Sequence, residues 1–245
     1  MSVCWICGAS GPLTGEHRAK KSDLRAVFGN VGPSAPLYWH DSKGRQNVPI
    51  RSLNADRLKV SDQLCADCNN RRTQPHDRAW EDLSEALRSR LSSSPSARRF
   101  HARTVFPYNT KQQLLNVHLY FAKLFGCFIS EDSIPLDLAS LATAIMQGRS
   151  HPKLYLKFGL GPFFRGERWS GRDHINVAAG GPYFASFLYC MRPIAVQVLL
   201  TEEAIAHNID AWHPRLGTTK LKLVDYAELL TGAAALQAVA KMTRS

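Results

Sequence analysis

Apolar residues in the first hundred positions recur at helical spacing in one long segment. The stripe runs through RAWEDLSEALRSRL and consists of Ala79, Trp80, Leu83, Ala86, Leu87 and Leu91. Residues three and four apart share one face of a helix, so this spacing predicts an amphipathic helix. Pro75 suits its first turn, and Thr73 is a candidate N-terminal cap. A second, shorter helix is predicted in KKSDLRAVFGN at 20–30.

Three short segments before that helix have the composition of strands. They are APLYWH at 35–40, QNVPIRSL at 46–53 and RLKVSDQLC at 57–65. The polar stretch DSKGRQN separates the first two and has the composition of a turn, which predicts a hairpin. The first seventeen residues are expected to form a cysteine-containing loop and a short strand that ends at Glu16 and His17.

The second half of the chain has a different pattern, with longer apolar runs. The polar stretch SSSPSARR at 92–99 precedes it and contains no core residue. Helices are predicted at 114–125, 136–146 and 227–242, and strands at 154–160, 183–200 and 220–226, with Pro193 interrupting the longest strand. The fold class is therefore α+β. The expected organisation is a module over 1–91, a linker over 92–105 and a separate α+β domain over 106–245.

No apolar run approaches the 18 residues of a membrane span. The N-terminus places cysteines where a signal peptide needs an apolar run, so a cytoplasmic protein is expected. The net charge is +11. Residues 1–105 carry 17 Lys and Arg against 10 Asp and Glu, and residues 106–245 carry 14 against 10. This surplus is consistent with a polyanion partner or with solubility alone.

Four of the six cysteines form two C-x-x-C pairs, Cys4 with Cys7 and Cys65 with Cys68. A redox pair does not explain two copies, and an intracellular chain disfavours disulfides. Two such pairs supply the four thiolates of a tetrahedral zinc site, which predicts structural Zn²⁺. The remaining two, Cys127 and Cys190, lie in apolar runs and are expected to be buried without a function.

The order of these motifs resembles the HNH endonuclease family in its zinc-bound form, C-x-x-C, then an acid-His pair, then C-x-x-C-N. The matching residues are the cysteine pairs, Glu16-His17 and Asn69, and the resemblance covers residues 4 to about 90. It implies a ββα-metal fold, with His17 as the general base and with Glu16 and Asn69 as ligands of a catalytic Mg²⁺ or Mn²⁺. A near-neutral imidazole and a hard cation with oxygen ligands both suit phosphodiester cleavage.

Two residues have open roles within this resemblance. Asn54 is the candidate for the middle Asn, which orients the base, but it lies further from Cys65 than the family spacing. It is either that residue or a turn residue, and in the second case another group or a backbone carbonyl orients His17. His76 is an additional metal ligand, a phosphate contact or a residue that begins the helix.

Basic residues flank the candidate site on both sides. The candidate phosphate contacts are Arg18, Lys20, Lys21, Arg71 and Arg72, which would position a nucleic acid without reading its sequence. We therefore expect a metal-dependent HNH endonuclease acting on DNA, encoded by a phage or a bacterial defence locus, with a homodimer as one option. The alternatives are a zinc-ribbon protein that binds nucleic acid without cutting it and a regulatory protein whose zinc module contacts other proteins.

The second half contains no catalytic constellation. His151, His174, His207 and His213 lack ligand spacing and are expected to be structural or surface residues. This domain is expected to recognise DNA, to sense a ligand or to dimerise.

Overall fold

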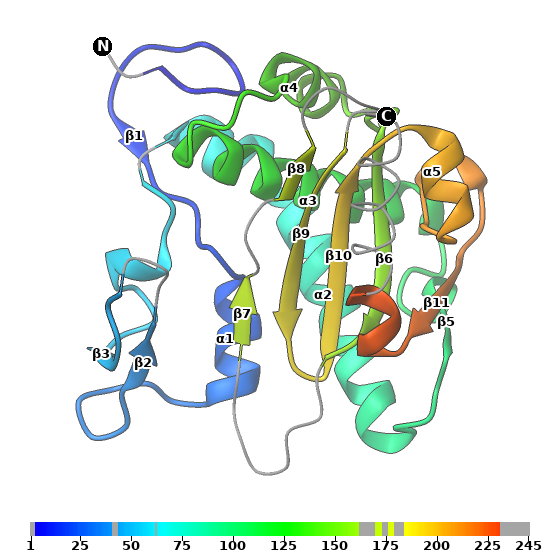
Figure 1. The fold of residues 1–245 in the computed structure, drawn as a ribbon, viewed down its shortest axis with the longest axis horizontal. Coiled ribbons are helices and arrows are strands. Elements are labelled where there is room, and N and C mark those ends of the chain that lie inside the picture. Colours follow the sequence, from blue (N-terminus) through cyan, green and yellow to red (C-terminus); the bar gives the residue numbers. More distant parts are fainter. Residues whose placement is uncertain are drawn as a thin grey trace.

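The computed structural model describes residues 3–40, 44–61, 63–161, 170–172, 176–178 and 184–230. His174 lies outside the described residues, and the predicted helix over 227–242 is described only as far as Leu230. Within the described part the protein is a mixed α+β fold (Figure 1), as predicted. No helix in this part is long and apolar enough to cross a membrane.

The most buried helix is α3 (Thr110–Glu131), which extends the predicted helix at both ends. Its buried residues lie on every face, because α2, α4 and the large sheet all pack against it. A helix that is apolar all round belongs inside a fold. The helix α4 (Leu138–Gln147) is capped at its start by Asp137, whose carboxylate accepts from the Ser140 amide at 3.2 Å. Its C-terminal cap is Gly148, which has the left-handed conformation.

A seven-stranded sheet forms the centre of the second half, in the order β5-β11-β6-β10-β9-β7, with β8 also on β9. Its strands are β5 (Arg99–His101), β6 (Leu154–Leu160), β7 (Ser170–Arg172), β8 (Asn176–Ala178), β9 (Phe184–Met191), β10 (Ile194–Leu200) and β11 (Lys220–Val224). The predicted break at Pro193 is confirmed, since β9 and β10 form a hairpin around it. Every residue of β6 and β10 is buried, so the sheet is covered on both faces. The short helix α5 (Glu203–Asn208) contributes Ala206 to a cluster with Tyr155 and Leu199.

Two small sheets lie in the N-terminal part. One joins β1 (Leu13–Thr14) to β4 (Leu64–Cys65), and the other is the predicted hairpin of β2 (Leu37–Trp39) and β3 (Val48–Ile50). The segment predicted as one strand over 57–65 is different: the 3-10 turn η1 (Asp56–Leu58) begins it, and β4 occupies only its end. A run of alternating residues was too short a signal to exclude this turn.

Two further helices complete this part, α1 (Lys21–Phe28) and α2 (Gln74–Ser93). A π-helical turn, η2 (Asp67–Arg72), precedes α2. Pro75 lies in the first turn of α2, as predicted, but Thr73 does not cap the helix with its side chain. Its hydroxyl instead donates backwards to the Cys68 carbonyl at 2.8 Å, which joins η2 to the start of α2.

A buried carboxylate connects the N-terminal part to the large sheet. Asp23 of α1 is fully buried and accepts four hydrogen bonds, from Trp80 Nε1 (2.8 Å), Ser84 Oγ (2.8 Å), Arg88 Nη1 (2.7 Å) and Tyr189 Oη (2.5 Å). These donors come from α2 and β9, so one side chain holds three elements together. A buried charge is tolerated when its lone pairs are occupied in this way.

One hydrophobic cluster includes residues from both halves of the described chain, from Cys4 to Leu223. Within the predicted linker, β5 joins the edge of the large sheet and Phe100 is buried. Cys127 and Cys190 are also buried, as expected. Division of the chain into folding units at 1–91 and 106–245 stays a prediction.

Candidate metal centre and active site

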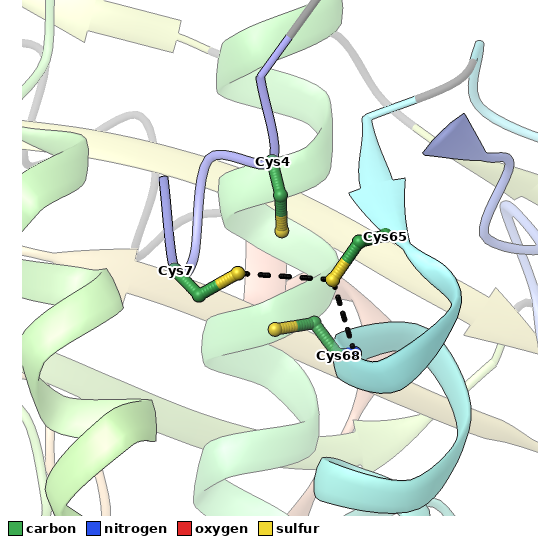
Figure 2. A group of neighbouring side chains, drawn as sticks. All are labelled: Cys4, Cys7, Cys65 and Cys68. Atoms are coloured by element: carbon green, nitrogen blue, oxygen red, sulfur yellow. Dashed lines mark hydrogen bonds between the residues drawn. The ribbon is translucent and has the colours of Figure 1, made fainter. Parts of the chain in front are cut away.

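Four cysteine sulfurs converge where the N-terminal loop meets β4 and η2. Pairing of β1 with β4 places Leu13 opposite Cys65, which brings the two cysteine pairs together. The four cysteine sulfurs all lie within 4.8 Å of one another, and Figure 2 shows them turned toward a common point. The predicted convergence of the two pairs, Cys4 with Cys7 and Cys65 with Cys68, is therefore confirmed.

The spacing of the sulfurs fits a tetrahedral metal ion. Cys7 Sγ and Cys65 Sγ are 3.7 Å apart, whereas a disulfide would bring them to about 2 Å. Zn–S bonds of about 2.3 Å in a tetrahedron place neighbouring sulfurs about 3.8 Å apart. The Cys68 amide lies 3.5 Å from Cys65 Sγ and supports a thiolate there. This donor set could bind zinc.

The four cysteines can all be thiolates at the same time only if a cation lies among them. Burial opposes ionisation of Cys4, but amide donors, Cys65 foremost, outweigh it and lower the pKa of Cys4 to about 7. Burial and the neighbouring thiols raise the pKa of Cys68 well above its ordinary value. A divalent ion removes this mutual repulsion because it attracts every thiolate.

The cysteine loop packs on α3 through Trp5. A Cβ atom built on Gly126, in the middle of α3, would lie 2.3 Å from Trp5 Cη2 and 2.4 Å from Cζ2. Glycine in a helix interior costs about 1 kcal/mol relative to alanine. Here it permits the indole of the metal loop to lie directly against the helix backbone.

His17 lies in an extended segment that pairs with residues 58–60. His17 and Lys59 form an antiparallel bridge, and the Val60 amide donates to the Glu16 carbonyl at 2.7 Å. The His17 Nε2 atom lies 3.1 Å from the Leu53 carbonyl oxygen. A carbonyl only accepts, so Nε2 carries the proton and Nδ1 of the neutral ring has a lone pair. Among the described residues, Nδ1 has no hydrogen-bond partner.

The environment of His17 favours the neutral ring. Burial lowers the pKa of His17, and the contact with Leu53 offsets only part of that effect. The side chain of Asn54 does not contact the ring: its Oδ1 accepts from Lys21 Nζ at 2.6 Å, and the backbone amide of Asn54 donates to Ser52 Oγ at 3.1 Å. The group that orients His17 is therefore the backbone carbonyl of Leu53, the residue before Asn54, and not the Asn54 side chain.

Glu16 points in the opposite direction, toward α3, because successive side chains of an extended segment alternate. It is buried, and its Oε2 accepts from Lys123 Nζ at 2.8 Å. Both carboxylate oxygens of Asp77 accept from the same ammonium at 2.9 Å. The Oε1 atom of Glu16 has no hydrogen-bond partner among the described residues.

Lys123 is fully buried yet remains an ammonium. Burial alone lowers its pKa, but the charges of Glu16 and Asp77 outweigh burial and raise the pKa above its usual value. Lys20 Nζ lies 3.3 Å from Asp77 Oδ1 and adds a second cation to the cluster. The carboxylates are therefore balanced by lysines, one of which comes from far along the chain.

Asn69, which follows the second cysteine pair, contacts the chain just before Glu16 and His17. Its Nδ2 donates to Thr14 Oγ1 at 2.9 Å and lies 3.4 Å from the Gly15 carbonyl. Its Oδ1 is buried and has no hydrogen-bond partner among the described residues. An unpartnered buried carbonyl oxygen costs about 1–3 kcal/mol, and a hard cation would satisfy it.

His76 is buried in the first turn of α2. Burial, with a contribution from the Lys123 charge, lowers its pKa to about 4. Its Nδ1 is buried without a partner in the described part of the chain. The His/Cys/Asp/Glu grouping found in the described residues is the four cysteines alone, so His76 does not join Glu16 in a cluster of that kind.

The predicted phosphate contacts are engaged with side chains of the protein. Arg18 forms a bidentate ion pair with Glu131 of α3, with Nη1 2.7 Å from Oε2 and Nη2 bonded to Oε1. Lys20 pairs with Asp77 and Glu81, and Arg71 and Arg72 both pair with Asp67. These pairs orient the basic side chains and reduce the charge that they present.

The sequence pattern did not indicate Lys123 or Glu131 as partners of the site. It left a backbone carbonyl open as the group that orients His17, without identifying it as that of Leu53. No protein-family model, curated protein or solved structure matches this chain, so its own residues carry the functional argument.

Proposed function

We propose that the protein is an HNH-type endonuclease that hydrolyses nucleic-acid phosphodiester bonds, with His17 as general base. The observation that carries this proposal is the contact between His17 Nε2 and the Leu53 carbonyl at 3.1 Å. It fixes the neutral tautomer in which Nδ1 accepts a proton. A neutral, oriented imidazole can deprotonate the water that attacks a phosphate.

Two side-chain oxygen atoms, one from Glu16 and one from Asn69, support a divalent cation in this proposal. Asn69 Oδ1 and Glu16 Oε1 have no hydrogen-bond partner among the described residues. Carboxylate and amide oxygens suit Mg²⁺ or Mn²⁺, which keep several waters. When bound, the cation would neutralise charge on the leaving oxygen. Lys123 holds the other oxygen of Glu16 and so keeps that carboxylate in place.

In this proposal the four cysteines have no catalytic role. Structural Zn²⁺ would hold the start of β1 and the end of β4 in register, and with them Glu16-His17 and Asn69. Replacing Cys65 with Ser should remove zinc from the purified protein. Elemental analysis would test this, and a wild-type protein without zinc would contradict the metal assignment.

Cleavage of supercoiled plasmid tests the enzymatic part. Wild type should relax or linearise the plasmid in Mg²⁺ or Mn²⁺, and His17→Ala should not. His207→Ala is the matched control, since His207 is an exposed histidine of α5. Equal activity in wild type and His17→Ala would exclude His17 as the base.

A second candidate is a zinc module that binds nucleic acid without cutting it. The Glu16–Lys123 contact favours this alternative, because a buried ammonium already balances the carboxylate. DNA retention in a gel-shift assay, with no cleavage in Mg²⁺ or Mn²⁺, would identify it.

A further inference from the structure

An open hollow lies beside the extended segment that contains His17. Gly15 and Val60 form part of its wall, and both flank the Glu16-His17 pair or its pairing partner. Other parts of the wall include Trp39 at the end of β2, Arg45 before β3, and Arg57 in η1. None of these three residues is among the predicted site residues.

The charges of the hollow are unequal. Its cations are Arg18, Arg45, Arg57 and Lys59, and its carboxylates are Asp56 and Glu131. Glu131 pairs with Arg18, and Asp56 Oδ1 lies 3.1 Å from Lys59 Nζ. The wall therefore carries more positive than negative charge. The side chains of Arg45 and Arg57 are both exposed, so a ligand in the hollow can reach them.

An aromatic ring lies among these cations. The guanidinium carbon of Arg18 lies 6.0 Å from the centroid of the Trp39 ring, and Trp39 is only partly buried. Proteins that bind nucleic-acid strands combine cations, which contact phosphates, with aromatic faces, on which bases or sugars lie. An anionic ligand without rings or sugars, or a purely apolar ligand, would use only part of this wall.

We propose that the hollow binds the phosphodiester backbone of a nucleic-acid strand, with Arg45 and Arg57 contacting its phosphates. This inference rests on the proposed function, because the strand would pass beside His17. These two arginines are distinct from the predicted phosphate contacts Arg71 and Arg72. The cations position the strand and take no part in the chemistry.

The salt dependence of binding reports how many phosphates the protein neutralises. Removing one such cation makes the slope of log K against log salt concentration shallower by about 0.9 on duplex DNA and about 0.7 on a single strand. The experiment measures binding of a fluorescein-labelled oligonucleotide, single-stranded or duplex, to His17→Ala protein at several KCl concentrations. Adding Arg45→Ala and Arg57→Ala together should make the slope shallower by about 1.8 on duplex or about 1.4 on a single strand.

A matched pair of exposed cations controls for general charge. The control residues are Arg103, which follows β5, and Lys220 of β11. The strands β5 and β11 lie across the molecule from β2 and β3 (Figure 1). Replacing both with Ala should leave the slope unchanged.

Three outcomes would overturn the inference. A slope that is unchanged by the Arg45 and Arg57 substitutions, in protein that still binds the oligonucleotide, would overturn the proposed role of the hollow. The proposed nuclease function would be unaffected by that result. An equal change of slope in the control variant would show that the effect comes from net charge and not from the hollow. Absence of binding by the parent protein to either oligonucleotide would overturn the inference together with the nucleic-acid function.

Discussion

The Leu53 carbonyl oxygen lies 3.1 Å from His17 Nε2 and determines which ring nitrogen carries the proton. A side-chain amide in this position could present either its oxygen or its NH₂ group, whereas a backbone carbonyl can only accept. The base is therefore oriented by the path of the chain between β3 and η1. Substitutions at Asn54, whose side chain faces Lys21, should affect His17 only through that path.

Asn69→Ala should weaken binding of the catalytic cation. The change removes Oδ1, a buried oxygen without a partner in the described part of the protein. The Mn²⁺ concentration for half-maximal cleavage should rise by about tenfold or more, because removing a group that supports a metal site weakens metal affinity on that scale. Titration of activity with Mn²⁺ measures this shift. Asn70→Ala is the control, because the neighbouring Asn70 is exposed and bonds to the Ala66 carbonyl; equal shifts in both variants would exclude Asn69 as a ligand.

Lys123→Met should destabilise the fold. It removes the ammonium that bonds Glu16 and Asp77, and it leaves the buried carboxylate of Glu16 and the partly buried carboxylate of Asp77 without this partner. Loss of one member of a buried ion pair costs about 3–5 kcal/mol. Urea unfolding at pH 7 measures the change. Adding Asp77→Asn should recover part of the loss, and a Lys123→Met protein as stable as wild type would show that the cluster is not a stabilising one.

Gly126→Ala should disturb the metal loop. Its new Cβ would meet the Trp5 ring at under 3 Å, and overpacking of this kind costs about 1–3 kcal/mol. The variant should release zinc faster to a chromogenic chelator. Pairing it with Trp5→Leu, which shortens the side chain, should restore part of the retention. A Gly126→Ala protein that retains zinc like wild type would show that the loop does not depend on this contact.

Acid should destabilise the protein through buried histidines of the second half. Burial lowers the pKa of His151 to about 4 and that of His118 well below its usual value. The unfolded chain, with histidine pKa values near 6.5, binds more protons between about pH 6.5 and 4, so stability is present above this range and falls as pH decreases through it. At pH 5 the shift of His151 alone costs about 2 kcal/mol.

Urea unfolding at pH 7 and pH 5 tests this window. His151→Asn should have a smaller pH dependence than wild type, and His207→Asn should not, because His207 is exposed. Equal pH dependence in wild type and His151→Asn would contradict the assignment.

Local spacing predicted much of the fold. The stripe that includes Trp80 and Leu87 indicated α2, the polar break between β2 and β3 indicated their hairpin, and Pro193 marked the turn between β9 and β10. The cysteine pairs predicted a convergence that the strand register of β1 and β4 produces. Each of these signals lies within a few residues of the element that it describes.

The surroundings of the site could not be predicted in the same way. Lys123 reaches Glu16 across 107 positions, and Glu131 reaches Arg18 across 113. A lysine in an apolar helical run gives no indication of its partner. The Leu53 carbonyl belongs to the backbone, so no residue type in the sequence indicates its role. Tertiary packing, not local pattern, decides these contacts.

Single-turnover cleavage of a labelled oligonucleotide by wild type and His17→Ala tests the central claim most directly. Loss of a general base lowers the rate by about 10²–10⁴-fold. We expect a fall in that range in Mg²⁺ or Mn²⁺, with zinc content and oligonucleotide affinity unchanged. Equal rates in the two proteins would contradict the account of His17 as the base.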